Sequence, residues 1–340
     1  MYFTSDNAAP VPPEVMAELA RANDGFTRGY GADQATAAAQ EMLREVLDAP
    51  DAVVHLVTTG TAANALALAA FCPPWGAVFC HSHAHVAEDE CGAPEFYTHG
   101  AKLVLVGGDH GRMDALALGT ALLRTGAGGV HGVQRGMLTL TNVTEAGTVY
   151  TAAETAELAG LARAQGLPVH LDGARFANAV MATGATPADL TWRAGVDVLS
   201  FGGTKNGLMG VEAVVFFDPA RAWEFELRRK RGGHLLSKGR YLGAQMVAML
   251  QDGRWRHWAA QANAMAALLA EGLATRGVVL RHPVQANILF VEWPVGTSAR
   301  LRAGGAMFYD MPATEGQEGA RLVTSWATTE ADVAAFLRLI

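Results

Sequence analysis

Alternation between short apolar runs and alanine-rich stretches, from about residue 50 to 215, constrains the fold of this chain most. The apolar runs are typical of buried strands, and stretches such as 62–70 and 152–165 are typical of helices. Strands are expected at 53–58, 77–80, 102–106, 137–140, 168–171, 196–201 and 212–217. The last strand follows its predecessor too closely for a crossover helix, so we expect it to be antiparallel. The sequence therefore predicts a wide, mostly parallel seven-stranded sheet covered on both faces.

The pattern changes after Tyr241, where a long helical stretch carrying Trp255 and Trp258 runs to about residue 276. Strand-like runs at 287–292 and 321–326 and a last helix from Glu330 follow. We expect an N-terminal arm at 1–14, a large domain at 15–240 and a smaller α+β domain at 241–340.

Composition excludes several classes of protein. The net charge of −7 and the scattered basic residues, apart from the run 228–231, argue against a nucleic-acid partner. No apolar run is long enough to cross a bilayer, and the start lacks the features of a signal peptide, so we expect a cytoplasmic protein without a membrane partner. Cys72, Cys80 and Cys91 have no metal-site spacing and are expected to be reduced thiols.

Lys205 and Asp172 each follow a predicted buried strand. Ligands of open α/β sheets bind in the crevice at the carboxyl ends of the strands, so both side chains should reach such a crevice. A lysine there can form a Schiff base with an aldehyde cofactor, and an aspartate can keep a pyridine nitrogen protonated. Taken singly, Lys205 also fits a surface charge and Asp172 a helix cap. Together they indicate a pyridoxal phosphate (PLP) enzyme.

Two further motifs suit ligand binding. Thr59-Gly60-Thr61 lies where a predicted strand ends and a predicted helix begins. Such a motif can be a phosphate-binding site or an ordinary capped turn. His81, His83 and His85 alternate, so on a strand they would share one face and could bind zinc in a metal-dependent hydrolase. We favour a role for His85 alone, because a metal site would leave Lys205 and Asp172 without a task.

A series of motifs in one order resembles the low-specificity L-threonine aldolases of the β-eliminating lyase group. The resemblance covers nearly the whole chain and implies a fold-type I, PLP-dependent transferase-like α/β fold with a smaller C-terminal α+β domain. The motifs are Ser5-Asp6, Tyr30-Gly31, Thr59 to Asn64, His85 with Glu90, Asp172 to Arg175, and Thr204 to Gly207, followed by Arg321 to Trp326 in the small domain.

The resemblance also implies a role for each site residue. Lys205 and Asp172 would hold the cofactor ring, which His85 would stack on, and Thr59, Gly60 and Thr61 would hold its phosphate. The substrate site would contain His85, His131 and Tyr30, with Glu90 nearby. The carboxylate of the substrate would be bound by Arg175, Arg321 and Ser5, since a planar guanidinium suits a carboxylate.

The segment Arg231 to Lys238 carries the implied quaternary structure. In the family this region presents a basic residue to the cofactor phosphate of a neighbouring subunit, so the resemblance implies a homodimer with shared active sites that assembles into a homotetramer. The commonest family pattern is a glycine-rich run ending in Arg-Gln, which this chain lacks. Arg231 and Lys238 are the candidates here, and we favour Lys238.

The implied reaction is cleavage of the Cα–Cβ bond of L-threonine, L-allo-threonine and related β-hydroxy-α-amino acids to glycine and an aldehyde. His85, His131 or a water that they hold would accept the hydroxyl proton. The nearest alternatives are a phenylserine-type aldolase, a β-eliminating lyase or an aminotransferase of the same fold. More distant alternatives are the metal-dependent hydrolase and a noncatalytic binding protein, which retention of both Lys205 and Asp172 disfavours.

Overall fold

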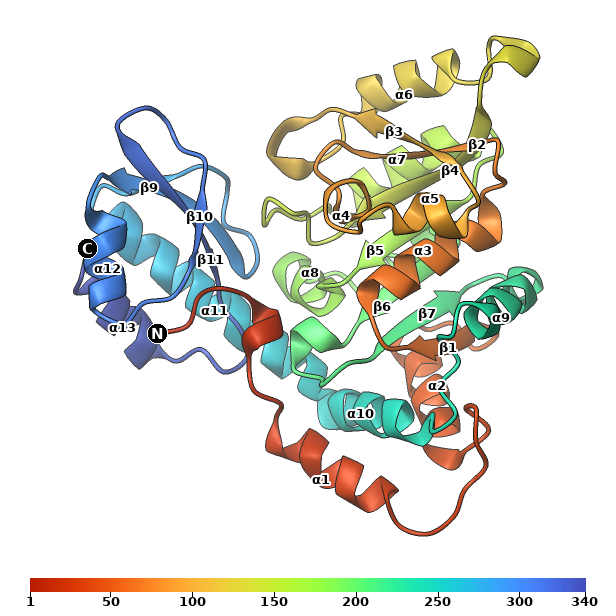
Figure 1. Ribbon diagram of the computed structural model, residues 1–340, viewed down its shortest axis with the longest axis horizontal. Helices are drawn as coiled ribbons and strands as arrows, with labels where there is room; N and C mark the ends of the chain where they lie inside the picture. The colour runs from red at the N-terminus through yellow and green to blue at the C-terminus, as the bar shows by residue number, and fades with distance from the viewer.

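The computed structural model describes residues 1–340 and contains a seven-stranded sheet in the order β1-β7-β6-β5-β4-β2-β3 (Figure 1). Its strands are β1 (Val53–Val57), β2 (Gly76–His81), β3 (Lys102–Val106), β4 (Gln134–Thr141), β5 (Val169–Gly173), β6 (Val198–Gly202) and β7 (Glu212–Phe216). Only β7 runs against the others, since it pairs antiparallel with both β1 and β6. The predicted seven-stranded, mostly parallel sheet and its antiparallel last strand are confirmed.

Helices cover both faces of this sheet. Helix α3 (Gly60–Phe71) packs across β1, β4, β5, β6 and β7 on one face and contacts α5 (Ala93–Tyr97) and α9 (Ala222–Arg231). The other helices of this part of the chain are α1 (Pro13–Ala22), α2 (Gln34–Val46), α4 (His85–Glu88), α6 (Ala115–Arg124), α7 (Ala152–Arg163), α8 (Phe176–Thr183) and α10 (Arg240–Leu250). Helices α7 and α8 both contact β5, and α2 and α10 contact β1.

Alternation of side chains along the central strands separates two cores. Leu171 and Phe201 belong to the largest apolar cluster, together with residues of α2, α7 and α8. Val198 and Phe216 point to the other face, into a cluster that includes α3 and α9. Because successive strand residues face opposite sides, Asp172 lies on the face away from Leu171, toward α3.

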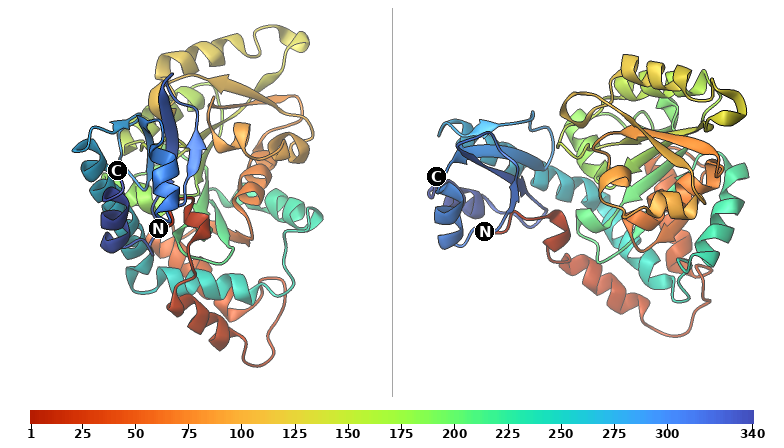
Figure 2. Two further views of the ribbon diagram at one scale, coloured as in Figure 1. Left: turned by 60° about the vertical axis from the view of Figure 1, so that its left-hand side comes forward. Right: turned by 45° about the horizontal axis from the view of Figure 1, so that its top comes forward.

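The C-terminal part forms a four-stranded antiparallel sheet in the order β10-β11-β9-β8 (Figure 2). Its elements are α11 (Arg254–Ala274), β8 (Val279–Leu280), β9 (Ile288–Pro294), α12 (Thr297–Ala303), β10 (Tyr309–Met311), β11 (Gln317–Val323) and α13 (Glu330–Leu337). The strand expected at 321–326 in fact begins at Gln317 and ends at Val323. Phe3, near the N-terminus, is buried in the core of this small sheet.

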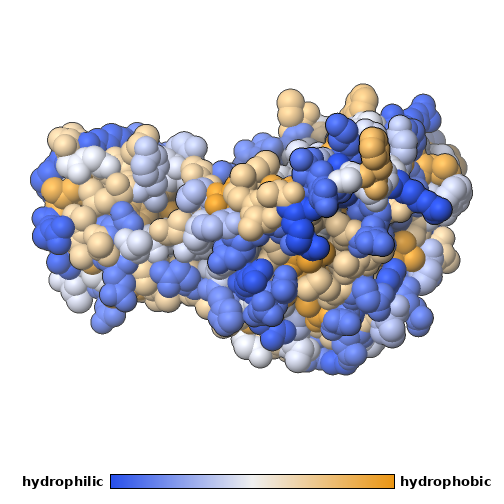
Figure 3. Space-filling view, turned by 90° about the horizontal axis from the view of Figure 1, so that it is seen from below, coloured by the Kyte–Doolittle hydropathy of each residue, from blue (hydrophilic) through white to orange (hydrophobic).

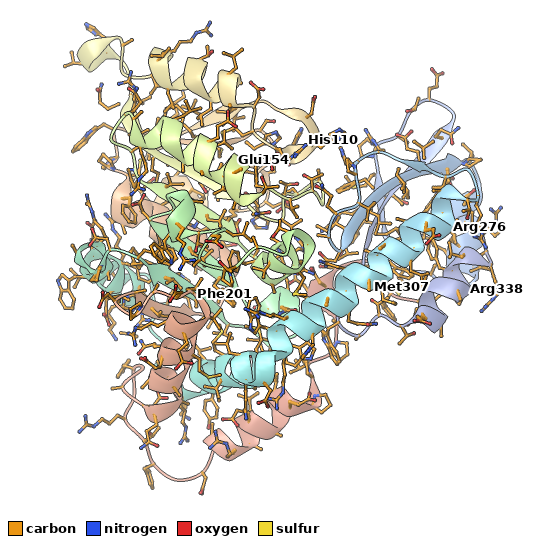
Figure 4. All side chains as sticks on the ribbon, turned by 180° about the vertical axis from the view of Figure 1, so that it is seen from behind. His110, Glu154, Phe201, Arg276, Met307 and Arg338 are labelled. Carbon is orange, nitrogen blue, oxygen red and sulfur yellow. The ribbon has the colours of Figure 1, made fainter.

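The long helical stretch expected after Tyr241 is two helices, α10 and α11. Asp252 and Gly253 between them have φ of 55° and 69°, which a continuous right-handed helix does not accommodate. Figure 4 shows α11 running from the large sheet into the small one. Its Trp255 packs in the large core, whereas Leu269 packs in the small core. The domain boundaries at 14/15 and 240/241 remain a proposal, and α11 belongs to the cores of both parts.

Figure 3 shows the outside of the molecule as two lobes of unequal size with a narrower waist between them. No helix is both long and apolar enough to span a membrane.

Candidate active site

A cavity of about 250 Å³ opens where β1, β5 and β6 end and α3 begins. It brings together residues that are far apart in the sequence and that were predicted to act together. Its lining residues are Asn7, Thr58, Thr59, Gly60, Thr61, Asn64, His85, Asp172, Ala174, Thr204, Lys205 and Glu212. Only Ala174 among them is apolar, so the cavity suits a polar, charged ligand.

The first turn of α3 forms one wall of the cavity. Thr59 caps the helix, and its Oγ1 accepts a hydrogen bond of 3.1 Å from the backbone N–H of Ala62. The N–H groups of Gly60 and Thr61 precede the first intrahelical bonds, so they remain free to donate. A Cβ at Gly60 would meet nothing within 4 Å, since the backbone there faces open space. Free N–H groups and the positive end of the helix dipole make this wall a site for an anion.

Asp172 lies at the end of β5 and is 2% exposed. Its Oδ1 accepts a hydrogen bond of 3.0 Å from the N–H of Ala174, and its Oδ2 accepts one of 2.9 Å from Nδ2 of Asn64. These two donors fix the orientation of a carboxylate that lines the cavity.

Lys205 follows β6 directly, on the short 3₁₀ helix η5 (Thr204–Asn206). Its buried neighbour Glu212 begins β7 and accepts a hydrogen bond of 2.7 Å from the N–H of Gly203. Burial raises the pKa of Glu212 to about 7, and the hydrogen bonds and the charge of Lys205 only partly oppose this rise. The cavity therefore holds an amine beside a carboxyl group that keeps its proton to a higher pH than an ordinary glutamate does.

His85 is the first residue of α4, and its Nδ1 lies 2.8 Å from Oε1 of Glu90. The same Oε1 accepts a hydrogen bond of 2.9 Å from Nδ2 of Asn64. The hydrogen bond to Glu90 raises the pKa of His85 although burial opposes it, and burial raises the pKa of Glu90. With Nδ1 donating to the carboxylate, Nε2 is the basic nitrogen of the neutral ring.

The sequence had suggested that the three alternating histidines share one face of a strand, but they do not lie on one strand. Strand β2 ends at His81, so His83 and His85 follow a turn in which strand alternation no longer applies. Nε2 of His81 lies 3.1 Å from the carbonyl oxygen of Gly108, and Nδ1 of His83 lies 2.8 Å from Oε1 of Glu88. No group of three or more His, Cys, Asp or Glu side chains is arranged to hold a metal ion. The metal-site interpretation thus loses its geometric basis.

Arg175 and Arg321 do not line the cavity themselves, but the charge of Arg175 interacts with that of Asp172, and the charge of Arg321 with that of Arg175. Arg175 is buried, and its Nε and Nη2 donate to Asp6 at 2.6 and 2.9 Å. Burial would raise the pKa of Asp6, but the charge and the hydrogen bonds of Arg175 hold it below its ordinary value. Burial, followed by repulsion from Arg175, lowers the pKa of Arg321. Two guanidinium groups that repel one another would both be stabilised by an added carboxylate.

The N-terminal segment reaches the same region. Ser5 caps the 3₁₀ helix η1 (Asp6–Ala8), and its Oγ accepts a hydrogen bond of 3.1 Å from the N–H of Asn7, which lines the cavity. Asp6 rather than Ser5 makes the direct contact with Arg175.

His131 does not join the cavity within one chain, contrary to the prediction. It ends the 3₁₀ helix η3 (Gly129–His131) just before β4 begins. Since β4 is parallel to β5, His131 lies at the edge of the sheet opposite to Asp172, and the eight residues of β4 span on the order of 25 Å. A role for His131 at a cavity would have to involve another copy of the chain.

Tyr30, Arg231 and Lys238 also lie outside the cavity. The Nζ of Lys230 lies 4.6 Å from the centre of the Tyr30 ring, and the N–H of Tyr30 donates to the carbonyl of Ser237. Arg231 ends α9, and Lys238 is exposed just before α10. Their implied role at the phosphate of a neighbouring copy remains a prediction.

Comparison with known proteins agrees with this geometry. The sequence model of the β-eliminating lyase family matches residues 3–294. A low-specificity L-threonine aldolase of Pseudomonas aeruginosa is 43% identical over 96% of this chain and 93% of its own length. One from a Pseudomonas species is 41% identical over 97% of this chain and 94% of its own. The chain belongs to the β-eliminating lyase family.

Solved structures extend the comparison to the fold. The threonine aldolase of Leishmania major superimposes with a TM-score of 0.94 at 31% identity, covering 99% of this chain and 98% of that one. The serine palmitoyltransferase of Sphingomonas wittichii superimposes with a TM-score of 0.72 at 16% identity, covering 100% and 86% of the two chains, and shows the shared fold alone. The predicted resemblance to threonine aldolases and the fold-type I architecture are both confirmed.

Several residues of this β-eliminating lyase site were given no role from the sequence, among them Asn64, Glu212 and Asp6. Asn64 is the only polar residue beyond the first turn of α3, and Glu212 is the only charged residue of β7. A lone polar residue in a buried apolar element is the signal that could have identified both. Asp6 had no such signal, because its partner Arg175 lies 169 residues away.

Proposed function

We propose that this protein is a PLP-dependent threonine aldolase, which cleaves L-threonine and L-allo-threonine to glycine and acetaldehyde. The observation that carries this proposal is the meeting of Lys205, Asp172 and the start of α3 in one polar cavity. Membership of a PLP-dependent family and the 41–43% identity to low-specificity L-threonine aldolases support it.

The residues of the cavity fit PLP. The free N–H groups at Gly60 and Thr61 match its phosphate, and the buried carboxylate of Asp172 matches a protonated pyridine nitrogen. Lys205 would hold the aldehyde through its ε-amino group, with His85 beside the ring. When bound, PLP draws electrons away from the α-carbon of an amino acid.

Arg175, Arg321 and His85 would act on the substrate. Arg175 and Arg321 would bind its carboxylate and so set the torsion that places the Cα–Cβ bond across the plane of the cofactor ring. Nε2 of His85 would accept the proton of the β-hydroxyl, directly or through a water. Loss of that proton allows the β-carbon to leave as an aldehyde.

Product analysis with purified protein tests the proposal. With PLP present, L-threonine and L-allo-threonine should each give equal amounts of glycine and acetaldehyde, and the protein should show a visible absorption band. Lys205→Ala should remove the band and lower kcat/KM by about a thousandfold or more, because the covalent anchor is lost.

Lys102→Ala is the matched control, since Lys102 is exposed on β3 and lines no part of the cavity. It should keep both the band and the products. Ammonia and a 2-oxo acid from threonine would indicate β-elimination instead. Turnover that required an added 2-oxo acid would indicate an aminotransferase. Activity that Lys205→Ala retained in full would contradict the proposal.

A further inference from the structure

A single amide, on a side chain that lines the cavity, joins two buried carboxylates. The Nδ2 of Asn64 donates to Oε1 of Glu90 and to Oδ2 of Asp172, both at 2.9 Å. Asn64, Glu90 and Asp172 are 2%, 4% and 2% exposed, so water does not replace these bonds. Oδ1 of Asn64 and Oε2 of Glu90 are buried without any partner. Both N–H groups of the amide therefore donate to carboxyl groups, one to Glu90 and one to Asp172.

Each of these carboxylates has a different second partner. Glu90 accepts from Nδ1 of His85 at 2.8 Å, whereas Asp172 accepts from the N–H of Ala174. His85 also experiences the charges of Asp172 and Glu145, which favour its protonated form, and that of Lys205, which opposes it. A series of hydrogen bonds thus runs from His85 through Glu90 and Asn64 to Asp172. Under the proposed function, His85 lies beside the ring of PLP and Asp172 meets the ring nitrogen.

We propose that Asn64 is a positioning residue that favours the ionised form of Glu90, orients the carboxylate of Asp172, fixes the tautomer of His85 and couples the His85–Glu90 pair to Asp172. This inference rests on the proposed function, which identifies the ring next to His85 and Asp172 as that of PLP. Asn64 lines the cavity, and in this assignment it acts through the two carboxylates.

The coupling follows from hydrogen bonding and charge. A donor to a carboxylate favours its ionised form, so loss of the Asn64 amide raises the proton affinity of Glu90. The His85–Glu90 pair then keeps its protons to higher pH, and the basic form of His85 appears later in a titration. Removing the charge of Glu90 has the opposite effect, because the hydrogen bond to that carboxylate is the main cause of the raised pKa of His85.

Two variants of the PLP-loaded enzyme test the inference, Asn64→Leu and Glu90→Gln. For Asn64→Leu, the acid limb of kcat/KM for L-threonine should move up by about one pH unit, and the pH midpoint of the visible band should move in the same direction. For Glu90→Gln, the acid limb should move down. The visible band supplies a readout that is independent of turnover.

Asn178→Leu is the matched control. Asn178 is a buried asparagine on α8 whose Nδ2 donates to Oδ1 of Asn263 at 2.9 Å, outside the cavity. Its replacement should lower the melting temperature and leave both midpoints unchanged. Where Asn64→Leu does not retain PLP, Asn64→Ser is measured in its place, since one hydroxyl can donate to only one of the two carboxylates.

Unmoved midpoints in the Asn64 variant, or a shift in the same direction as Glu90→Gln, would overturn the inference while leaving the proposed function intact. A wild-type protein with neither a visible band nor glycine formation would remove the proposed function, and the inference with it.

Discussion

Glu212 shows how burial changes the chemistry of a single residue. The carboxyl group is enclosed at the start of β7, and its pKa rises to about 7 from an ordinary value near 4.5. Between these two pH values, the folded protein binds a proton at Glu212 that the unfolded chain has released. The stability that this proton confers is complete below about pH 4.5 and is lost as the pH rises through about 7.

Glu212→Gln should remove this part of the pH dependence. Between pH 5 and pH 8, we expect the wild-type protein freed of cofactor to lose about 2 to 3 kcal/mol relative to the variant. Urea unfolding at the two pH values measures the difference. The exposed Glu315→Gln serves as control and should follow the wild type. Parallel curves for wild type and Glu212→Gln would contradict the assignment.

At the scale of elements, the start of α3 combines two tasks. Thr59 closes the first turn of the helix and also lines the cavity. Thr151 caps α7 in a similar way, with Glu154 completing a capping box, but lies outside the cavity. The two threonines therefore separate the stability of a helix cap from the binding of an anion.

Thr59→Ala and Thr151→Ala should each lower the free energy of unfolding by about 1 kcal/mol, because each leaves a backbone N–H without its acceptor. Only Thr59→Ala should weaken the binding of PLP, since only the N-terminus of α3 faces the cavity. Thermal unfolding and PLP titration of the two variants measure these effects. Equal PLP affinity in both would argue against the start of α3 as the phosphate site.

At the scale of the whole molecule, the loop after β4 joins the large sheet to the small one. The N–H of Val149 donates to Oε1 of Gln285 at 2.9 Å, and Oγ1 of Thr148 donates to the carbonyl of His110 at 2.7 Å. Figure 4 labels His110 on the side of the large part that faces the small sheet. Gly147 lies in this loop with φ of 81°, and a Cβ there would come within 2.5 Å of the carbonyl oxygen of Ile288 on β9.

Gly147→Ala should displace the small sheet and with it Arg321, so the KM for threonine should rise by about five- to tenfold, a loss on the order of 1 kcal/mol in carboxylate binding. Gly277→Ala is the control, because Gly277 has φ of 76° but open space where the Cβ would lie. Both variants should lose about 1 kcal/mol of stability through backbone strain. Steady-state kinetics should separate them, and an equal KM in both would contradict a role for this contact.

The sequence alone determined the sheet and the meeting of Lys205 with Asp172. Both residues lie at or just after the carboxyl end of a predicted strand, and the carboxyl ends of neighbouring parallel strands meet at one edge of a sheet, so local pattern was sufficient. The motif Thr59-Gly60-Thr61 likewise indicated where α3 begins, with Thr59 as its cap.

Only the tertiary structure decided which side chains surround these groups. Asn64 meets Asp172 across 108 residues and Asp6 meets Arg175 across 169, in each case through the packing of separate elements. His131 lies at the opposite edge of the sheet because it precedes its strand rather than follows it. Local propensity fixes where an element begins and ends, whereas contacts between distant side chains depend on how the elements pack together.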